Sequence, residues 1–256
     1  MTTIGILGVG ALAGLMLRGL QGSGYAFILS PRGATTAARL SADFGCAIAA
    51  SNQDLVDRAD AVFVTLPAAT GAVELARLNF RPGQPVLSAM AGTGLARLRQ
   101  VIGPAKGCVG MMPGYANAYR LGPSILCPDG GFWHDFLSHV GPVHGFDDEA
   151  TFTAAATFGA FSGATVGWMA RIIAWYQAQG LDPDTARALV AGTLRGNAEV
   201  LLREPRPLCD IAKGVTTPGG ITLQLLDALD DRGALDAWGE GLDAILTRIG
   251  GRRSDD

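Results

Sequence analysis

The sequence has few charged side chains, which make up 17% of its 256 residues. An average globular domain carries about 25%. Because a monomer covers itself with polar surface, so small a charged fraction favours an extensive interface between subunits. The formal net charge is -3 at pH 7, so we expect no general attraction to nucleic acid or to anionic lipid.

Cysteine pairs and metal-ligand spacings are also missing. The four cysteines lie far apart and form no C-x-x-C pair: Cys46, Cys108, Cys127 and Cys209. Free thiols in a reducing cytoplasm are therefore expected. The histidines at 134, 139 and 144 recur at a spacing that turns each to a different side of a helix. We predict no metal site and a cytoplasmic location.

Hydrophobic runs of the membrane-spanning kind are lacking too. Residues 4–17 are apolar, but no basic residue precedes them and glycines interrupt them, unlike the core of a signal peptide. Residues 151–170 carry no charge over about the length of a membrane span. They consist largely of Ala, Thr, Gly and Ser, so their hydropathy is low for a span. A buried helix at a helix–helix interface fits better, and no membrane partner is expected.

The first part of the chain alternates short β-type runs with amphipathic segments. Strands are predicted at residues 3–8, 26–30, 61–66, 86–89, 107–111 and 124–127, and helices at 11–21 and 34–44. Apolar strands that alternate with helices indicate parallel βαβ units covered on both faces. Residues 1–146 are therefore predicted to form a Rossmann-type parallel sheet.

From about Asp147 the pattern becomes purely helical. One long helix is predicted over residues 149–179, with Gly180 placed to end it. Asp182 and Pro183 provide the N-cap and first residue of the next helix. Two more helices follow Pro218. The fold class is thus α/β, with an all-helical C-terminal domain at residues 147–256, and this boundary depends on the change of period alone.

A glycine-rich turn joins the first strand to the first helix. Its residues spell G-x-G-x-x-A: Gly8, Val9, Gly10, Ala11, Leu12 and Ala13. The first glycine permits a tight turn, the second lets the backbone approach a pyrophosphate, and the small alanine lets helix and strand pack closely. The exposed amides at the helix start then bind phosphates. A glycine-rich turn that arose by chance is the alternative, but the flanking strand and helix favour a dinucleotide site.

The second strand ends in Ser30-Pro31-Arg32. Proteins that prefer NAD usually place an acidic residue here, where it binds the ribose 2′-hydroxyl. The guanidinium of Arg32 can instead pair with a 2′-phosphate through two hydrogen bonds, which favours NADP(H). An arginine that is merely solvated in a loop is the alternative.

Residues 214–222 are too rich in Gly, Pro and Thr for a plain junction between helices. Such a turn presents backbone N–H groups and hydroxyls together at a helix start, which makes a natural carboxylate receptor. A capped turn with no ligand is the alternative.

Over nearly its whole length the chain resembles the pyrroline-5-carboxylate reductase family. The nucleotide turn, Leu66-Pro67, residues 88–92, Met112-Pro113 and residues 216–222 occur in matching order. The resemblance implies that the cofactor contacts Leu66, Pro67, Ala91 and Gly92. It places the substrate at Pro113 and at the family's V-T-S-P-G-G-x-T loop, which here supplies Thr217, Gly219, Gly220, Ile221 and Thr222.

The same resemblance implies an activity and an assembly. The expected reaction is the NADPH-dependent reduction of a cyclic imine carboxylate, pyrroline-5-carboxylate to proline. The helical domain would form a homodimer or a higher homo-oligomer. The small-molecule imine and the nucleotide are the expected ligands.

Two segments depart from the family pattern. Its M-P-N-T-P reads Met112-Pro113-Gly114-Tyr115-Ala116 here, and its S-G-S-G-P-A aligns with residues 158–163, which include two phenylalanines. Tyr115 is our candidate catalytic residue, as a hydrogen-bond donor to the imine nitrogen; a tyrosine that only packs its ring in the interdomain cleft is the alternative. Two other functions stay open: a reductase of a different imine, and a non-catalytic NADP-binding oligomer.

Overall fold

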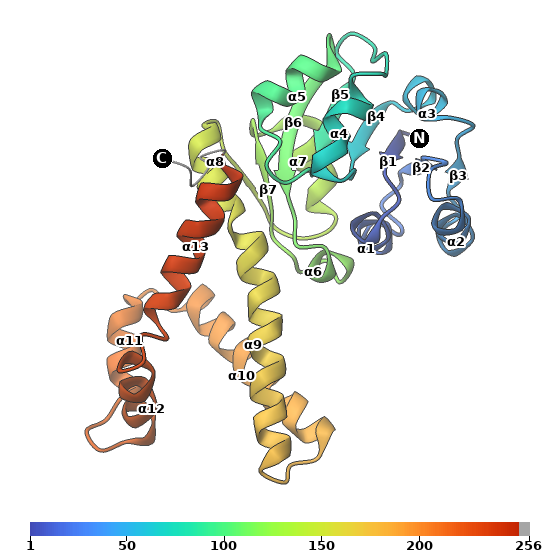
Figure 1. The fold of residues 1–256 in the computed structure, drawn as a ribbon. Coiled ribbons are helices and arrows are strands. Elements are labelled where there is room, and N and C mark those ends of the chain that lie inside the picture. The colour runs from blue at the N-terminus through green and yellow to red at the C-terminus, as the bar shows by residue number, and fades with distance from the viewer. Residues whose placement is uncertain (251–256) are drawn as a thin grey trace. The chain divides into compact units, whose positions relative to one another are not determined.

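A sheet of eight strands forms the centre of the chain's first unit in a computed structural model that describes residues 1–250 (Figure 1). The strand order is β3-β2-β1-β4-β5-β6-β7-β8. The strands are β1 (Thr3–Leu7), β2 (Ala26–Leu29), β3 (Ala47–Ile48), β4 (Ala61–Val64), β5 (Pro85–Ser88), β6 (Lys106–Met111), β7 (Ser124–Cys127) and β8 (Val143–Gly145). Only the β6–β7 pair is antiparallel within this sheet. The order of the first six strands is that of dinucleotide-binding folds, which confirms the predicted Rossmann-type sheet.

Apolar side chains cover both faces of this sheet because successive residues of a strand point to opposite sides. On β4, Val62 and Val64 join one cluster of buried residues, whereas Phe63 joins another. Helices supply the other half of each cluster: α1 (Ala11–Gly19), α2 (Ala34–Phe44), α3 (Asn52–Arg58), α4 (Ala68–Leu75), α5 (Leu95–Ile102), α6 (Tyr115–Ala118), α7 (Gly131–Ser138) and α8 (Glu149–Ala156).

The six predicted strands are confirmed to within one or two residues at most ends. β3 and β8 were not predicted, because strands of two and three residues are too short to show an alternating hydrophobic pattern. Helices α3 to α7 were not predicted either, because their lengths of four to eight residues give little helical periodicity.

The prediction of one helix over residues 149–179 is wrong. The structure has α8 and then α9 (Phe158–Ala178), with Thr157 between them. The Thr157 hydroxyl donates to the Ala154 carbonyl at 2.8 Å, and the Thr157 amide donates to the same carbonyl. Such local bonds from a threonine compete with the regular i to i−4 ladder of a helix, and here they interrupt it.

The chain divides into two compact units. Residues Met1–Gly159 group with residues 246–250, and Ala160–Ile245 form the second unit. This division falls later than the predicted boundary at residues 146 and 147. The reason is that α8 packs on β7, and its Phe152 and Ala156 join the core beside the sheet.

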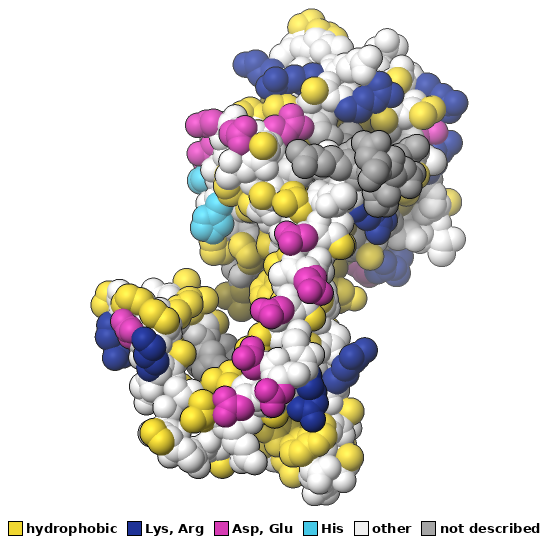
Figure 2. Space-filling model, turned by 60° about the vertical axis from the view of Figure 1, so that its left-hand side comes forward, with side chains coloured by type: hydrophobic (Ala, Val, Ile, Leu, Met, Phe, Trp, Pro, Cys, Tyr) yellow, Lys and Arg dark blue, Asp and Glu magenta, His cyan; other side chains and the backbone are white. Residues whose placement is uncertain are grey.

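The second unit is helical, as predicted. It holds most of α9 and α13 (Asp236–Ile249), together with α10 (Pro183–Arg203), α11 (Leu208–Val215) and α12 (Ile221–Asp230). Asp182 caps α10 by accepting hydrogen bonds from two backbone amides, with Pro183 at the first helical position. The 21-residue α9 has no buried residue. Hydrophobic side chains lie open on the surface of the helical unit (yellow in the lower part of Figure 2). Within residues 1–250, no helix combines the length and the hydropathy needed to cross a membrane.

Candidate active site

Gly8 shapes the turn after β1. Its φ of +110° lies in a region that side-chain-bearing residues rarely adopt. A Cβ at this position would lie 2.8 Å from the carbonyl carbon and oxygen of Thr65. The Thr65 hydroxyl donates to the Gly8 carbonyl at 2.5 Å and holds the turn against the end of β4. The sequence therefore needs glycine here for conformation and for space.

The start of α1 is open to a ligand. Gly10 is its N-cap and offers no side-chain acceptor to the first amides of the helix. A Cβ on Gly10 would meet nothing within 4 Å. Backbone N–H groups with free space before them can bind an anion, so this turn fits a pyrophosphate.

Five of the predicted segments meet at one edge of the sheet. The nucleotide turn, Ser30 to Arg32, Leu66-Pro67, Ala91-Gly92 and Pro113 to Tyr115 each follow a strand, and those strands, β1, β2, β4, β5 and β6, run parallel. Their carboxyl ends therefore lie together. In open α/β sheets ligands bind outside these ends.

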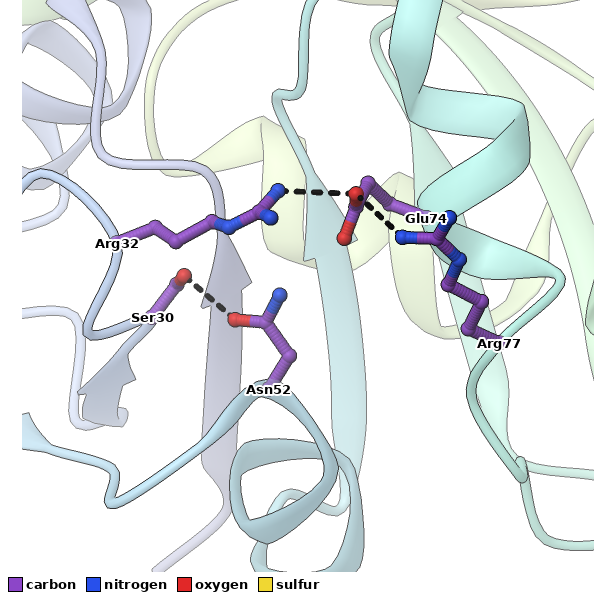
Figure 3. A network of polar contacts seen from close by, with 5 residues as sticks. All are labelled: Ser30, Arg32, Asn52, Glu74 and Arg77. Atoms are coloured by element: carbon purple, nitrogen blue, oxygen red, sulfur yellow. Dashed lines mark hydrogen bonds and ion pairs between the residues drawn. The ribbon is translucent and has the colours of Figure 1, made fainter.

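At the end of β2, Ser30 is fully buried and its hydroxyl donates to Oδ1 of Asn52 at 2.7 Å (Figure 3). Asn52 is the first residue of α3 and was not among the residues predicted to bind the cofactor. Its amide nitrogen points away from Ser30 in Figure 3, and an amide N–H is a donor suited to a phosphate or hydroxyl.

Arg32 lies at the same edge and is paired. Its Nη1 lies 3.0 Å from Oε1 of Glu74, and Nη1 of Arg77 lies 3.3 Å from the same oxygen (Figure 3). The Arg32 side chain is 66% exposed, whereas that of Glu74 is 17% exposed. A guanidinium that is this exposed can turn toward a ligand, but a carboxylate already faces it.

A small cavity opens beside Ala91 and Gly92. Both residues line it, as do Met111 and Glu149. Oε1 of Glu149 accepts a hydrogen bond from the Leu95 backbone amide at 2.5 Å. The carboxylate thus ties the turn after β5 to α8. In the sequence Glu149 reads only as an acidic residue at a helix start, because its partner is 54 residues away.

The loop after β6, where the sequence departs from the family pattern, is held by a buried asparagine. Oδ1 of Asn117 accepts from the Gly114 amide at 2.9 Å, and its Nδ2 donates to the Gly122 carbonyl at 2.8 Å. Gly114 has a φ of +81° and packs against α1. Tyr115 follows it with its side chain 75% exposed. The loop is therefore rigid where it leaves the sheet, while the tyrosine ring stands clear of its own unit's core.

Asn117→Ala is expected to destabilise the fold by about 2–4 kcal/mol, because it leaves a buried amide and buried carbonyls without partners. Chemical denaturation would measure this loss. Asn79→Ala is the matched control, since Asn79 is exposed in the same unit. Equal stability of the two variants would contradict the role of Asn117 as the anchor of this loop.

The predicted carboxylate loop belongs to the second unit. It joins α11 to α12, with Gly219 at a φ of +76° and Gly220 as a helix N-cap that has no side-chain acceptor. The Gly220 amide donates to the Thr217 carbonyl at 2.8 Å. Thr217, Gly219, Ile221 and Thr222 are exposed. The first amides of α12 are thus available to an anion, as expected for a carboxylate receptor.

The two phenylalanines of the altered segment take different positions. Phe158 is partly buried against the core of the first unit. Gly159 approaches Met111 so closely that a Cβ would lie 2.9 Å from its sulfur. In the second unit, Phe161 contacts Trp238 edge to face, with ring centroids 5.8 Å apart. These larger side chains therefore pack rather than supply hydroxyls.

The four cysteines are free thiols, as predicted. Burial raises the pKa of Cys46 to about 11, and mainly burial raises the pKa of Cys108 to about 12. Both therefore stay protonated at neutral pH, and a protonated thiol is a poor nucleophile. Covalent catalysis through either residue is not supported.

The geometry defines a class of protein: a Rossmann-type nucleotide-binding sheet with an open helix start, followed by a helical unit. Two family models match the chain. The model of pyrroline-5-carboxylate reductase dimerisation matches residues 149–251, and that of the coenzyme F420-dependent NADP oxidoreductases matches residues 3–92. These matches confirm the resemblance of the chain to the pyrroline-5-carboxylate reductase family.

Similar proteins agree with this assignment. The pyrroline-5-carboxylate reductase of Pseudomonas aeruginosa is 28% identical over 238 residues, which cover 86% of this chain and 85% of that protein. The solved 1-pyrroline-5-carboxylate reductase of Streptococcus pyogenes has a TM-score of 0.86 at 22% identity, over 96% and 97% of the two chains. The Plasmodium falciparum pyrroline carboxylate reductase, solved with NADP bound, has a TM-score of 0.84 at 16% identity, over 97% of each chain. The last two likenesses establish the fold.

Proposed function

We propose that this protein reduces a cyclic imine carboxylate with NADPH, and that its substrate is pyrroline-5-carboxylate, giving proline. The observation that carries the proposal is the turn at Gly8 and Gly10, which offers an open, uncapped helix start at the carboxyl edge of the sheet. The Pseudomonas aeruginosa relative is a pyrroline-5-carboxylate reductase.

The residues present fit the nucleotide. The amides at the start of α1 would hold the pyrophosphate, and Ser30, Asn52 and Arg32 would hold the adenosine ribose with its 2′-phosphate. Leu66, Pro67, Ala91 and Gly92 follow β4 and β5 at the same edge and would line the rest of the cofactor. When bound, the reduced nicotinamide supplies the hydride to the carbon of the C=N bond.

The chain's own task is to hold the imine and to keep its nitrogen protonated. The uncapped start of α12, with Thr217, Gly219, Gly220, Ile221 and Thr222, would receive the carboxylate. Pro113 would lie beside the ring. A cyclic imine can arrive already protonated from water, so a strong protein acid is not required. The Tyr115 hydroxyl would donate a hydrogen bond to the nitrogen of the neutral imine, and its oxygen would accept one from the N–H of the protonated form.

Tyr115→Phe is expected to lower kcat about tenfold or more, because it removes a hydrogen bond to the reacting nitrogen, and such a bond to a charged group contributes about 1.5–3 kcal/mol. Tyr119→Phe is the control: Tyr119 is also exposed, and its ring lies 4.8 Å from the Arg18 guanidinium carbon, a contact that phenylalanine retains. Unchanged turnover in Tyr115→Phe would remove the tyrosine from the mechanism.

The assembly follows from the helical unit. Phe161, Trp168 and Trp175 on α9 are exposed, and α9 and α13 line a groove of apolar residues. A second copy of the chain would cover these surfaces, as the matched dimerisation model supports. We propose a cytoplasmic homodimer or a higher homo-oligomer. Sedimentation that showed only monomers would contradict it.

NADPH oxidation with pyrroline-5-carboxylate, followed at the NADPH absorbance band, tests the function. The six-membered ring homologue is the parallel substrate. Rapid turnover of the five-membered ring would support the proposal. Turnover of only the larger ring would indicate that the natural substrate is a different imine. Tyr115, Phe158 and Phe161, which differ from the family pattern, are consistent with that alternative. Tight NADPH binding without oxidation of any imine would favour a non-catalytic role.

A further inference from the structure

Glu74 places a negative charge beside the residue that would recognise the cofactor's phosphate. It lies near the end of α4, and its largely buried carboxylate accepts Arg32 and Arg77 on the same oxygen, at 3.0 and 3.3 Å (Figure 3). A largely buried charge needs compensation, which these two guanidiniums supply. Nη1 of Arg32 is thus paired with a carboxylate before any ligand arrives.

We propose that Glu74 sets the preference between NADP(H) and NAD(H) by competing with the 2′-phosphate for Arg32. This inference rests on the proposed function, because it assumes that the strand end at Ser30 binds the adenosine ribose. A 2′-phosphate must compete with Glu74 for the charge of Arg32 and then remain near a like charge. A ribose with a free 2′-hydroxyl meets neither cost.

Arg77 makes this exchange possible. When Arg32 turns to the phosphate, Arg77 remains on Oε1 of Glu74, so the buried carboxylate keeps one partner. The negative charge of Glu74 therefore still repels the phosphate. The outcome is a weaker preference for NADP(H) than Arg32 alone would give.

The neighbouring polar pair does not discriminate between the two cofactors. Ser30 and Asn52 are neutral, and their hydroxyl and amide can bind a 2′-hydroxyl or a 2′-phosphate. The charges that can separate the cofactors at this strand end are therefore those of Arg32, Glu74 and Arg77.

Glu74→Gln tests the inference. Glutamine keeps the size of the side chain and an oxygen that accepts from both arginines, so only the charge is removed. Binding of NADPH and NADH would be measured by nucleotide fluorescence in a phosphate-free buffer of low ionic strength. We expect NADPH to bind about three to ten times more tightly, and NADH to change less than about twofold, as for the loss of one partly screened like charge. The gain should shrink as salt is added.

Glu199→Gln is the matched control. Glu199 pairs with Arg203 at 2.7 Å on α10 in the second unit, and its loss changes the net charge equally. It should leave both affinities unchanged. Thermal unfolding of each variant would confirm that the fold is intact.

Unchanged or weaker NADPH binding in Glu74→Gln would overturn the inference, as would an equal gain for NADH. These results leave the reductase proposal standing, because they do not depend on turnover of an imine. Wild-type protein that binds neither nucleotide would overturn both.

Discussion

Gly8→Ala is expected to lower NADPH affinity at least a hundredfold or to prevent folding of the first unit. Alanine at a φ of +110° costs about 1–3 kcal/mol in backbone strain alone. Its Cβ would also lie 2.8 Å from the Thr65 backbone, which is held in place by β4 and cannot give way cheaply. The turn would open, and the amides of α1 would no longer point at a common ligand. Fluorescence titration with NADPH and a thermal unfolding curve measure the two effects.

Two other glycines separate the causes. Gly22 has a φ of +77°, and a Cβ there would meet nothing within 4 Å, so Gly22→Ala carries the backbone strain without the collision. It should be mildly destabilised and bind NADPH normally. Gly10→Ala should fold like the wild type yet bind NADPH poorly, because its methyl group would stand where a pyrophosphate approaches. Normal NADPH affinity in Gly8→Ala would contradict the assignment of this turn.

Arg32→Ala is expected to weaken NADPH binding about tenfold to a hundredfold, since a charge-assisted hydrogen bond contributes about 1.5–3 kcal/mol. NADH affinity should change less than about threefold. The fold should not suffer, because Arg77 still neutralises Glu74 and the Arg32 side chain is 66% exposed. Separate titrations with the two nucleotides give the ratio.

Arg39→Ala is a suitable control. Arg39 also lies close to this strand end in sequence, is exposed, and pairs only with Asp43 one turn along α2. An equal loss of NADPH and NADH affinity in Arg32→Ala would mean that Arg32 does not read the 2′-phosphate.

Local signals in the sequence were sufficient to predict six strands of the sheet and the nucleotide turn. β4 is an unbroken apolar run because both of its faces are buried, and such a run is visible in four residues. The conformation of Gly8 likewise leaves a mark, since only glycine tolerates it. Carboxylate binding at residues 217–222 stays a prediction, although the structure leaves the start of α12 open.

Residues whose roles depend on distant partners were not predictable in the same way. Asn52, Glu74 and Asn117 are ordinary polar residues in the sequence. They acquire their roles by contacts with Ser30, Arg32 and Val140, which the packing of separate elements creates. The break at Thr157 escaped notice for another reason: a threonine hydroxyl that bonds to the backbone three residues earlier does not change the hydrophobic period.

The absence of buried side chains on α9 has a consequence for how the protein folds. A helix with no fully buried side chain gains little stability from its own chain, because most helical stability in proteins comes from packing. If a second copy covers α9, as proposed, then folding of the helical unit and association of two chains are one reaction. The midpoint of thermal unfolding would then rise with protein concentration, by mass action. The cellular abundance of the chain would in that way govern how much of it is folded.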